Sequence, residues 1–315
     1  MKTINGKVGI IIVNYKSYED TYECLQSIQE IDYPDFSVYV VDNGSNDGSL
    51  EKIQILTKKF PFPLIVIGES QNLGFAGGNN IGIKQAVKDN CNYFWLLNND
   101  TIVLPNSLSP LVKTINTGNK VGIVGSKIYY NNSNKIWFAG GQINSLTLET
   151  SHIGMNVTDN GMYDKEKEVG YITGCSLLFE KNLLNDIGFM EEDYFLYYEE
   201  TDWNIRARNA GWIIKYAPES VIYHKVSASS TTGNQLSPYV DYYFLRNHYV
   251  LCKKFQKRYL SFISLPYLIW KFVKKVIKVY VKCNRETRKE RIWYLKAGFL
   301  DGIYRRMGKH PIYTK

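Results

Sequence analysis

Long apolar runs and paired cysteines are missing from this chain of 315 residues. The longest uncharged stretch near the C-terminus, YLSFISLPYLIW, is 12 residues long, well short of the roughly 20 that a membrane-spanning helix needs. The N-terminus has Lys2 and Lys7 and then only GIIIV, too short for the apolar core of a secretory signal peptide. The five cysteines are scattered, with no C-x-x-C pair, which suits a reducing compartment better than a disulfide framework. We therefore expect a cytoplasmic protein.

The common phosphate-binding fingerprints are also missing. The Gly-rich stretch NLGFAGGNN has neither G-x-x-x-x-G-K-[ST] nor G-x-G-x-x-G spacing, which disfavours a P-loop hydrolase and a nicotinamide enzyme. Its glycines Gly74, Gly77 and Gly78 precede a predicted helix, whose N-terminus would attract phosphate. The alternative is an ordinary tight turn between a strand and a helix.

Acidic residues are scarce in the last part of the chain. From Lys253 onward there are 18 Lys and Arg against three acids, a net charge of 18 − 3 = +15. The rest of the chain carries 20 − 27 = −7, so a mildly acidic body precedes a strongly basic tail. Such asymmetry predicts an anionic partner for the tail, either nucleic acid or a membrane surface.

Four strand–helix units fill the first hundred residues. The predicted strands are VGIIIVNY, SVYVVD, PLIVIGES and YFWLLNND, and the continuous apolar runs among them are typical of a buried parallel sheet. The pattern predicts an α/β doubly wound sheet. In such sheets ligands bind beyond the carboxyl ends of the strands, so Asn14, Asp42, Asn72 and Asp100 are expected to line one rim. Asp100 could hold Mg²⁺ or Mn²⁺ there, or could merely end the strand in an Asx turn.

The pattern becomes mixed after Asp100, and SASSTTGNQLSP (227–238) is the clearest break in composition. We expect one catalytic domain over residues 1–235, in two halves at 1–110 and 111–235. A helical C-terminal region over 236–315 follows it.

Residues 267–282, YLIWKFVKKVIKVYVK, form a predicted basic amphipathic helix. At about 100° per residue, Ile269, Phe272, Val273, Val276 and Tyr280 share one face. The lysines of the segment cluster on the opposite face: Lys271, Lys274, Lys275, Lys278 and Lys282. A helix in a membrane interface has this signature, and so does a helix packed on the protein's own core; the basic tail favours the membrane.

The stretch YYEETDWNIRAR places three carboxylates, Glu199, Glu200 and Asp202, directly after an aromatic run. Acids in a first helical turn are stabilised by the helix dipole by roughly 0.3–1 kcal/mol each, which accounts for one or two of them. On a helix Glu199, Asp202 and Arg206 share a face, so Arg206 can pair with one of these acids. Glu200 points about 100° away and is left free.

Seven motifs together resemble family 2 inverting glycosyltransferases, in particular the bacterial rhamnosyltransferase-like branch. They are VNY, VVDNGSNDGS, NLGFAGGNN, LLNND, TGCSLLF, YYEETDWNIRAR and YHKVSASS. The likeness covers about residues 7–250, and GFLDGIYRRMGK near the C-terminus also resembles the end of such enzymes. The resemblance implies a GT-A fold with a Rossmann-like, mostly parallel central sheet, a nucleotide-sugar donor bound by residues 1–110, an acceptor bound by 111–235, and a divalent metal.

On the donor side, the resemblance assigns Asn14 and Asp42 to the base and ribose. Asp100 matches the last residue of a D-x-D metal motif, and His224 matches a metal-binding histidine, although a lone histidine is often a structural hydrogen-bonder. The first position of the motif is Asn98, a weaker ligand than aspartate. The predicted donor pocket is completed by Asn72, Gly74, Asn98 and Asn99.

On the acceptor side, the family's E-D pair aligns with Glu199 and Glu200, and Asp202 joins them in the predicted catalytic group. Glu200 would be the general base of a single displacement that inverts the anomeric carbon. TGCSLLF would lie between donor and acceptor, and Trp137 and Trp203 would either stack on sugars or belong to the core.

The expected function is transfer of a sugar, with dTDP-rhamnose as the best guess for the donor and UDP-hexoses or UDP-galactofuranose behind it. The acceptor would be a hydroxyl of a lipid-linked or polysaccharide glycan, at the inner face of the cell membrane. A sugar-phosphate nucleotidyltransferase and a non-catalytic membrane-associated scaffold of the same fold remain as alternatives. A nucleic-acid partner is disfavoured, and a homo-oligomer is left open.

Overall fold

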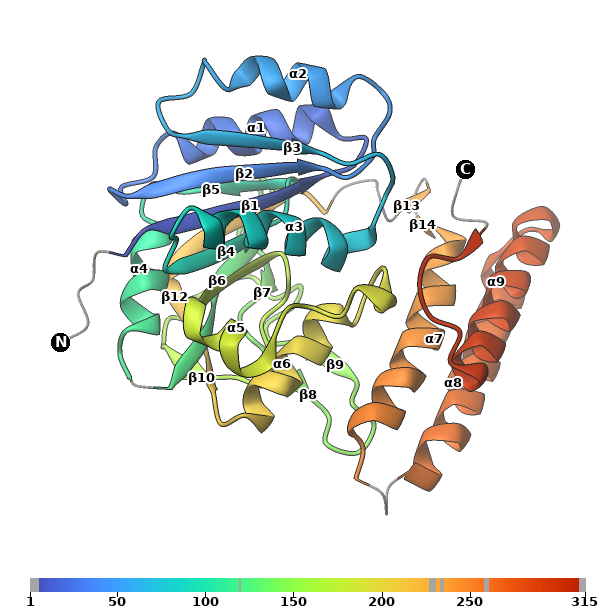
Figure 1. Cartoon of the computed structure of the whole chain (residues 1–315). Helices are drawn as coiled ribbons and strands as arrows, with labels where there is room; N and C mark the ends of the chain where they lie inside the picture. The colour runs from blue at the N-terminus through green and yellow to red at the C-terminus, as the bar shows by residue number, and fades with distance from the viewer. Residues whose placement is uncertain (1–5, 119, 227–230, 233–234, 258–260, 312–315) are drawn as a thin grey trace.

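The computed structural model describes residues 6–118, 120–226, 231–232, 235–257 and 261–311. An α/β body holds the N-terminal two thirds of the chain, and three long helices stand together along one side of it (Figure 1). Among the described residues no helix is both long and apolar enough to cross a membrane.

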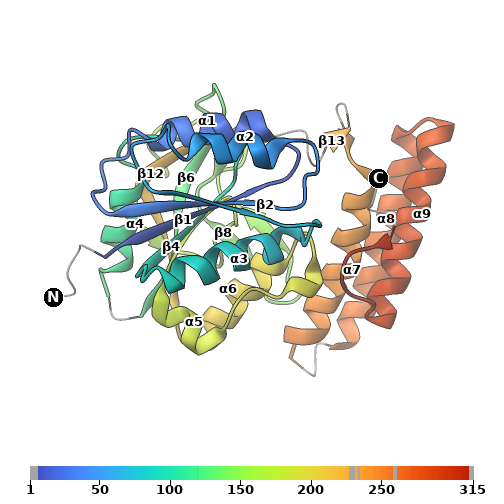
Figure 2. The ribbon, with the colours of Figure 1, turned by 45° about the horizontal axis from the view of Figure 1, so that its top comes forward.

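The first half of the body is the parallel part of the sheet, in the order β4-β1-β2-β3. Its strands are β1 (Val8–Asn14), β2 (Phe36–Asp42), β3 (Leu64–Gly68) and β4 (Tyr93–Leu97). The connecting helices are α1 (Tyr18–Ile28), α2 (Ser49–Leu56) and α3 (Gly74–Lys88). Helices α1 and α2 cover one face and α3 the other (Figure 2). The four strand–helix units predicted from the apolar runs are therefore confirmed, and the register places Asn14 opposite Asp42.

The second half extends the sheet with mixed pairing. β11 joins β4 and β6 antiparallel, whereas β6 and β12 run parallel. The strands of this half are β5 (Thr101–Val103), β6 (Val121–Tyr130), β7 (Ile136–Phe138), β10 (Lys167–Glu168), β11 (Ser176–Glu180) and β12 (Ile213–His224). Two small hairpins pair β8 (Gly141–Ile143) with β9 (Thr150–His152) and β13 (Thr231–Thr232) with β14 (Gln235–Leu236).

The helices of this half are α4 (Leu108–Ile115), α5 (Lys181–Ile187), the 3₁₀ turn η1 (Glu192–Tyr194) and α6 (Glu199–Asn209). Helix α6 is followed by a left-handed Gly211, with φ of 81°, a common way to end a helix. Trp203 on α6 is fully buried and its Nε1 donates to the carbonyl of Gly188 at 2.9 Å. Trp203 is therefore a core residue and not a sugar-stacking surface.

The C-terminal region consists of α7 (Pro238–Phe255), α8 (Ser261–Lys282) and α9 (Arg285–Tyr304). A small apolar core joins these helices, formed by Leu245, Tyr249, Leu268, Val279 and Leu295. The region therefore has an apolar core of its own, and it also packs on the body through α7. The domain limits at 235 and 110 stay predictions; the second falls inside α4.

The predicted faces of α8 are corrected by the structure. Of the expected apolar face, Phe272 and Val276 pack against the helical core, whereas Ile269, Val273 and Tyr280 are exposed. Of the expected lysine face, two members turn inward: Lys271 pairs with Glu149 and Lys275 with Asp241. The periodicity identified an amphipathic helix, but α8 presents three sides: one buried, one apolar and exposed, and one partly paired.

Candidate active site

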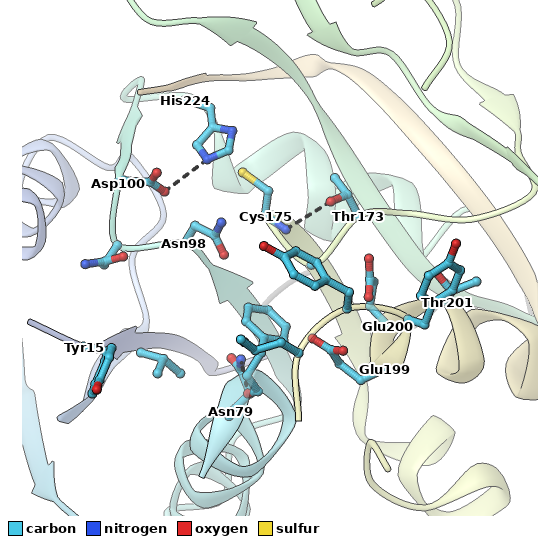
Figure 3. Close-up of a pocket in the computed structure, with 18 of the residues that line it drawn as sticks. Tyr15, Asn79, Asn98, Asp100, Thr173, Cys175, Glu199, Glu200, Thr201 and His224 are labelled. Carbon is cyan, nitrogen blue, oxygen red and sulfur yellow. Dashed lines mark hydrogen bonds and ion pairs between the residues drawn. The ribbon is translucent and has the colours of Figure 1, made fainter. Parts of the chain in front are cut away.

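One cavity of about 460 Å³ opens where the carboxyl ends of β1 and β4 meet the first turns of α3 and α6. This is the rim predicted from the strand pattern. Figure 3 shows its two functional sides: Asp100 and His224 lie at one side, Glu199 and Glu200 at the other, with Thr173 and Cys175 between them.

Asp100 and His224 face each other across the end of the sheet. Antiparallel pairing of β5 with β12 places His224 opposite Thr101, next to Asp100. The His224 Nε2 lies 3.1 Å from Asp100 Oδ1, and both side chains are buried. Burial alone would lower the pKa of His224, but the neighbouring Cys175 and Asp100 oppose it and raise the pKa to about 10. Trp137 lines the cavity beside them, with its ring edge-on to His224 at 4.5 Å between centroids.

Glu199 and Glu200 begin α6 and differ in exposure. Glu199 is 3% exposed, and in the described part of the chain its Oε2 has no hydrogen-bond partner. Burial, and then the charge of Glu200, hold the pKa of Glu199 well above its usual value. Glu200 is more accessible, and burial also raises its pKa. Because two adjacent carboxyls compete for one charge, we infer that Glu199 keeps its proton while Glu200 presents a carboxylate to the cavity.

Asp202 does not share that cavity, which corrects its predicted place in the catalytic group. Its carboxylate is fully buried and is bound by Arg206 Nε at 2.7 Å, Lys254 Nζ at 2.7 Å and the Tyr194 hydroxyl at 3.1 Å. The predicted pairing of Arg206 with one of the acids is confirmed. Asp202 therefore anchors α6 to α7 instead of taking part in chemistry.

Asn14 and Asp42 lie beneath the cavity floor. The Asn14 Nδ2 donates to Asp42 Oδ2 at 2.7 Å, and Ser45 donates to the same carboxylate from its backbone N–H and its hydroxyl. Asn99, which lines the cavity, donates to the Thr21 hydroxyl at 3.0 Å, and that hydroxyl donates to Asn14 Oδ1 at 2.7 Å. Asn99 is therefore connected to this network. Direct contact of Asn14 and Asp42 with a donor stays a prediction, because their polar atoms are already bound to one another.

The Gly-rich loop forms the wall at the N-terminus of α3. The Asn72 side chain accepts a hydrogen bond from the N–H of Gly74 at 2.8 Å. Gly74 has φ of 77°, and a Cβ there would lie 2.1 Å from the carbonyl oxygen of Phe195. A residue with a side chain would therefore force apart the loop and the segment that leads into Glu199. Both predicted residues line the cavity.

Sequence reasoning missed several residues that line the cavity. Asn43 accepts from the N–H of Leu73 at 3.0 Å and donates to the carbonyl of Gly74 at 2.9 Å, so it shapes the same loop. Its position directly after Asp42 was a signal that could have been used. His152 and Tyr171 also line the cavity, but they come from β9 and from a loop whose short motifs carry no pattern of their own.

A family model, glycosyl transferase family 2, matches residues 9–188. The chain belongs to glycosyl transferase family 2. The match spans the parallel sheet, the Gly-rich loop and Asp100, and it ends before Glu199. This assignment makes the chain a transferase and decides against the nucleotidyltransferase alternative.

Relatives of this glycosyltransferase are found in archaea and bacteria. The chain is 26% identical over 312 residues to the low-salt glycan biosynthesis hexosyltransferase Agl10 of Haloferax volcanii, covering 98% of this chain and 94% of that protein. It is 23% identical over 240 residues to the N-acetylglucosaminyl-diphospho-decaprenol L-rhamnosyltransferase of Mycobacterium tuberculosis, covering 70% and 76% of the two chains.

Among solved structures, the chain resembles a mannosyltransferase from Pyrobaculum calidifontis in complex with GDP-Man and Mn²⁺. The TM-score is 0.61 at 16% identity, over 96% of this chain and 89% of that one. At this identity the likeness shows the fold, and it confirms the predicted GT-A architecture.

Asp100 and His224 fit a divalent metal as a pair of protein ligands once the metal displaces the His224 proton, because only a neutral imidazole nitrogen binds a metal. A carboxylate oxygen and an imidazole nitrogen converge, and a third protein ligand is not required, since Mg²⁺ is commonly bound by one or two carboxylates plus substrate phosphates. Within residues 6–118, 120–226, 231–232, 235–257 and 261–311 no group of three or more His, Cys, Asp and Glu side chains could hold a metal alone. Asn98 lines the cavity nearby.

The raised pKa of Glu199 predicts a pH-dependent cost in stability. Between its usual value of 4.5 and the raised value, the folded protein holds a proton that the unfolded chain has released. The free energy of unfolding therefore falls as pH rises. Glu199→Gln removes this titration, so the melting temperature of the variant relative to the wild type should rise as the pH increases above 4.5.

Thermal melts at several pH values measure this difference. The control is Glu219→Gln, the same chemical change at an exposed position. If the difference between Glu199→Gln and the wild type does not vary with pH, Glu199 ionises normally in the folded protein.

Proposed function

We propose that this glycosyltransferase moves a sugar from a nucleotide-diphosphate donor to an acceptor hydroxyl with inversion, using Glu200 as the general base. The observation that carries the proposal is the arrangement of the cavity, with an accessible carboxylate at the start of α6 opposite the Asp100–His224 pair. In a single displacement the acceptor oxygen bonds to the anomeric carbon, and its proton passes to a Glu200 carboxylate oxygen. The bond from that carbon to the diphosphate oxygen breaks, and its electron pair leaves with the diphosphate.

The charge of the cavity supports a metal for the donor. The described residues that line it include three acidic side chains, of which Asp100 and Glu200 carry negative charge while Glu199 is inferred to be protonated, but no lysine or arginine. A diphosphate would meet net negative charge there. Asp100 and His224 would hold a Mn²⁺ or Mg²⁺ ion, which would supply the positive charge that a leaving diphosphate needs. The solved mannosyltransferase of the same fold holds Mn²⁺ with its nucleotide sugar.

The first donor to test is dTDP-rhamnose, because one of the relatives is a rhamnosyltransferase. GDP-mannose, UDP-hexoses and UDP-galactofuranose follow. The relatives act in glycan biosynthesis or on a diphospho-decaprenol acceptor, so the proposed acceptor is a hydroxyl of a lipid-linked or surface glycan.

Replacing each glutamate by glutamine in a separate variant distinguishes their roles. Glu200→Gln should reduce transfer by roughly 10²–10⁴-fold, the usual contribution of a general base, while nucleotide binding is kept. Glu199→Gln should retain most of the activity, because glutamine resembles the protonated side chain inferred at that position. Initial rates with a labelled nucleotide sugar measure both. Full turnover in Glu200→Gln would refute the proposed base, and the reverse pattern would make Glu199 the base.

Metal dependence is tested by nucleotide binding. Ligands that bind only the folded state raise its stability, by about 2.7 kcal/mol at 100 times Kd. We expect one of dTDP, UDP and GDP to raise the melting temperature, and Mn²⁺ to enlarge the shift. Asp100→Asn and His224→Ala should remove the Mn²⁺-dependent part, whereas the exposed Asp35→Asn should not. A nucleotide shift that is equal with and without Mn²⁺ in the wild type would contradict the metal site.

We further propose that α8 rests on the inner face of the cell membrane, where a lipid-linked acceptor is found. An apolar stripe runs along its exposed side and comprises Leu265, Ile269, Trp270, Val273, Ile277 and Tyr280. Lys274 and Lys278 lie beside the stripe on the helical wheel, a combination suited to an anionic lipid surface. A second copy of the chain is the competing partner for this face.

Vesicle sedimentation tests the α8 stripe. The wild type should pellet with vesicles that contain phosphatidylglycerol and less with neutral vesicles. Ile269→Glu combined with Ile277→Glu should weaken binding at least about tenfold, since burying one such side chain contributes roughly 1.5–3 kcal/mol. The control is Ile55→Glu, at an isoleucine on α2 that is at least as exposed as Ile269 and Ile277. No pelleting of the wild type refutes the proposal, and a dimer that the double variant dissociates assigns the stripe to a second copy.

A further inference from the structure

The segment that leads into Glu199 and Glu200 is strained. Phe195, Tyr197 and Tyr198 have φ angles of 65°, 68° and 74°, in the left-handed region. Each such residue is destabilising, because its Cβ crowds the following carbonyl oxygen. Strained conformations of this kind persist only where the surrounding structure holds them. Contacts to the backbone of this segment should therefore reveal what keeps it in place.

Asn247 on α7 binds three carbonyl groups of the segment. Its Nδ2 lies 3.0 Å from the oxygen of Tyr194, 2.7 Å from that of Leu196 and 2.8 Å from that of Tyr197. The side chain is fully buried. Only the nitrogen of an amide side chain can donate, so three carbonyl acceptors define which way Asn247 points.

Arg246 fixes the other end of the same amide. Its Nε donates to Asn247 Oδ1 at 2.8 Å, and its Nη2 donates to the carbonyl of Tyr194 at 2.8 Å. Its Nη1 donates to the carbonyl of Gly308 at 2.6 Å, and the N–H of Gly308 donates to the carbonyl of Asp193 at 2.7 Å. The Arg246 guanidinium is fully buried, and its hydrogen bonds to the carbonyls of Gly308 and Tyr194 and to Asn247 offset the cost of burying its charge. Arg246 therefore fixes the position of the groups that it binds.

The segment is also held from two other directions. The carbonyl of Phe195 accepts a hydrogen bond from the N–H of Phe75 at 2.8 Å, which connects the segment to the Gly-rich loop. Beyond the two glutamates, Lys254 at the end of α7 reaches Asp202. Helix α7 therefore binds the chain on both sides of Glu199 and Glu200.

We propose that Asn247, oriented by Arg246, is a positioning residue that keeps Phe195, Tyr197 and Tyr198 in their positive-φ conformations and so aims the Glu200 carboxylate into the cavity. The inference rests on the proposed role of Glu200 as the base. Asn247 is outside the set of described residues that line the cavity. It acts through the backbone of the segment, not on the substrate.

Asn247→Asp is the sharpest test, because it keeps the size of the side chain and removes the donors. Transfer should fall about 100-fold in kcat, the usual consequence of a misplacement of about 1 Å. Nucleotide binding with Mn²⁺ should be unchanged. The acid limb of the pH–rate profile should move to lower pH, since a carboxylate turned toward solvent loses the burial that raises its pKa. Asn247→Ala replaces it if the aspartate variant does not fold.

The matched control is Leu245→Ala, equally buried on α7 but packed toward α8 and α9. It should lower the melting temperature while kcat and the pH profile stay as in the wild type. Hydrogen exchange of the amides of residues 195–200 should accelerate in Asn247→Asp and not in Leu245→Ala.

Full kcat in folded Asn247→Asp overturns the proposal. So does a loss of kcat without faster exchange in residues 195–200, because the effect then lies elsewhere. If the wild type transfers from no donor, the proposed function fails, and the exchange measurement alone decides whether Asn247 holds the segment.

Discussion

Ionising both of two neighbouring, buried glutamates at the start of a helix is unfavourable, because burial and mutual repulsion both destabilise the second charge. Much of this structure accommodates that constraint. Glu199 is buried, and one of its oxygens has no hydrogen-bond partner among the described residues, whereas Glu200 opens toward the cavity. The dipole of α6 lowers the cost of negative charge at this end. Like-charge repulsion then favours keeping one proton on Glu199, which leaves Glu200 as the accessible carboxylate.

The same constraint shapes the opposite side of the cavity. With Glu200 on α6 and Asp100 at the end of the sheet, the proposed nucleotide-diphosphate donor would need a cation to offset the negative charge of the cavity. His224 beside Asp100 provides a second ligand of the kind that Mn²⁺ accepts. The proposed donor side and the proposed base are thus separated in space, with Thr173 and Cys175 between them (Figure 3).

The C-terminal helices are part of this arrangement. Through Asn247 and Lys254, α7 binds the chain before and after the two glutamates. Through Lys271, α8 pairs with Glu149, one residue before the cavity-lining Thr150. A region whose charge alone suggested only an anionic partner therefore also contacts the segment that carries the two glutamates, and its apolar stripe is exposed.

The strands and helices of the first hundred residues could be predicted because each apolar run is continuous and the turns between them are rich in glycine and asparagine. The same rule placed Asn72 and Asp100 at the cavity, since carboxyl ends of parallel strands share one edge. It could not show that Asn14 and Asp42 would lie beneath the floor, bound to one another. Burial of a side chain depends on what covers the strand end, and the covering residues are remote in sequence.

Periodicity determined which residues share a face of α6 and α8, but not which part of the protein each face packs against. It correctly paired Arg206 with an acid. The partner is Asp202, which is bound by Arg206 and by Lys254 of α7 and lies outside the cavity lining. It grouped the lysines of α8, yet Lys271 and Lys275 turn inward because Glu149 and Asp241 happen to lie opposite them. The sequence by itself determined the sheet, the order of the motifs and the family. Only the tertiary structure decided which carboxylate is free and what holds it, because charges far apart in the chain become neighbours only when the helices pack.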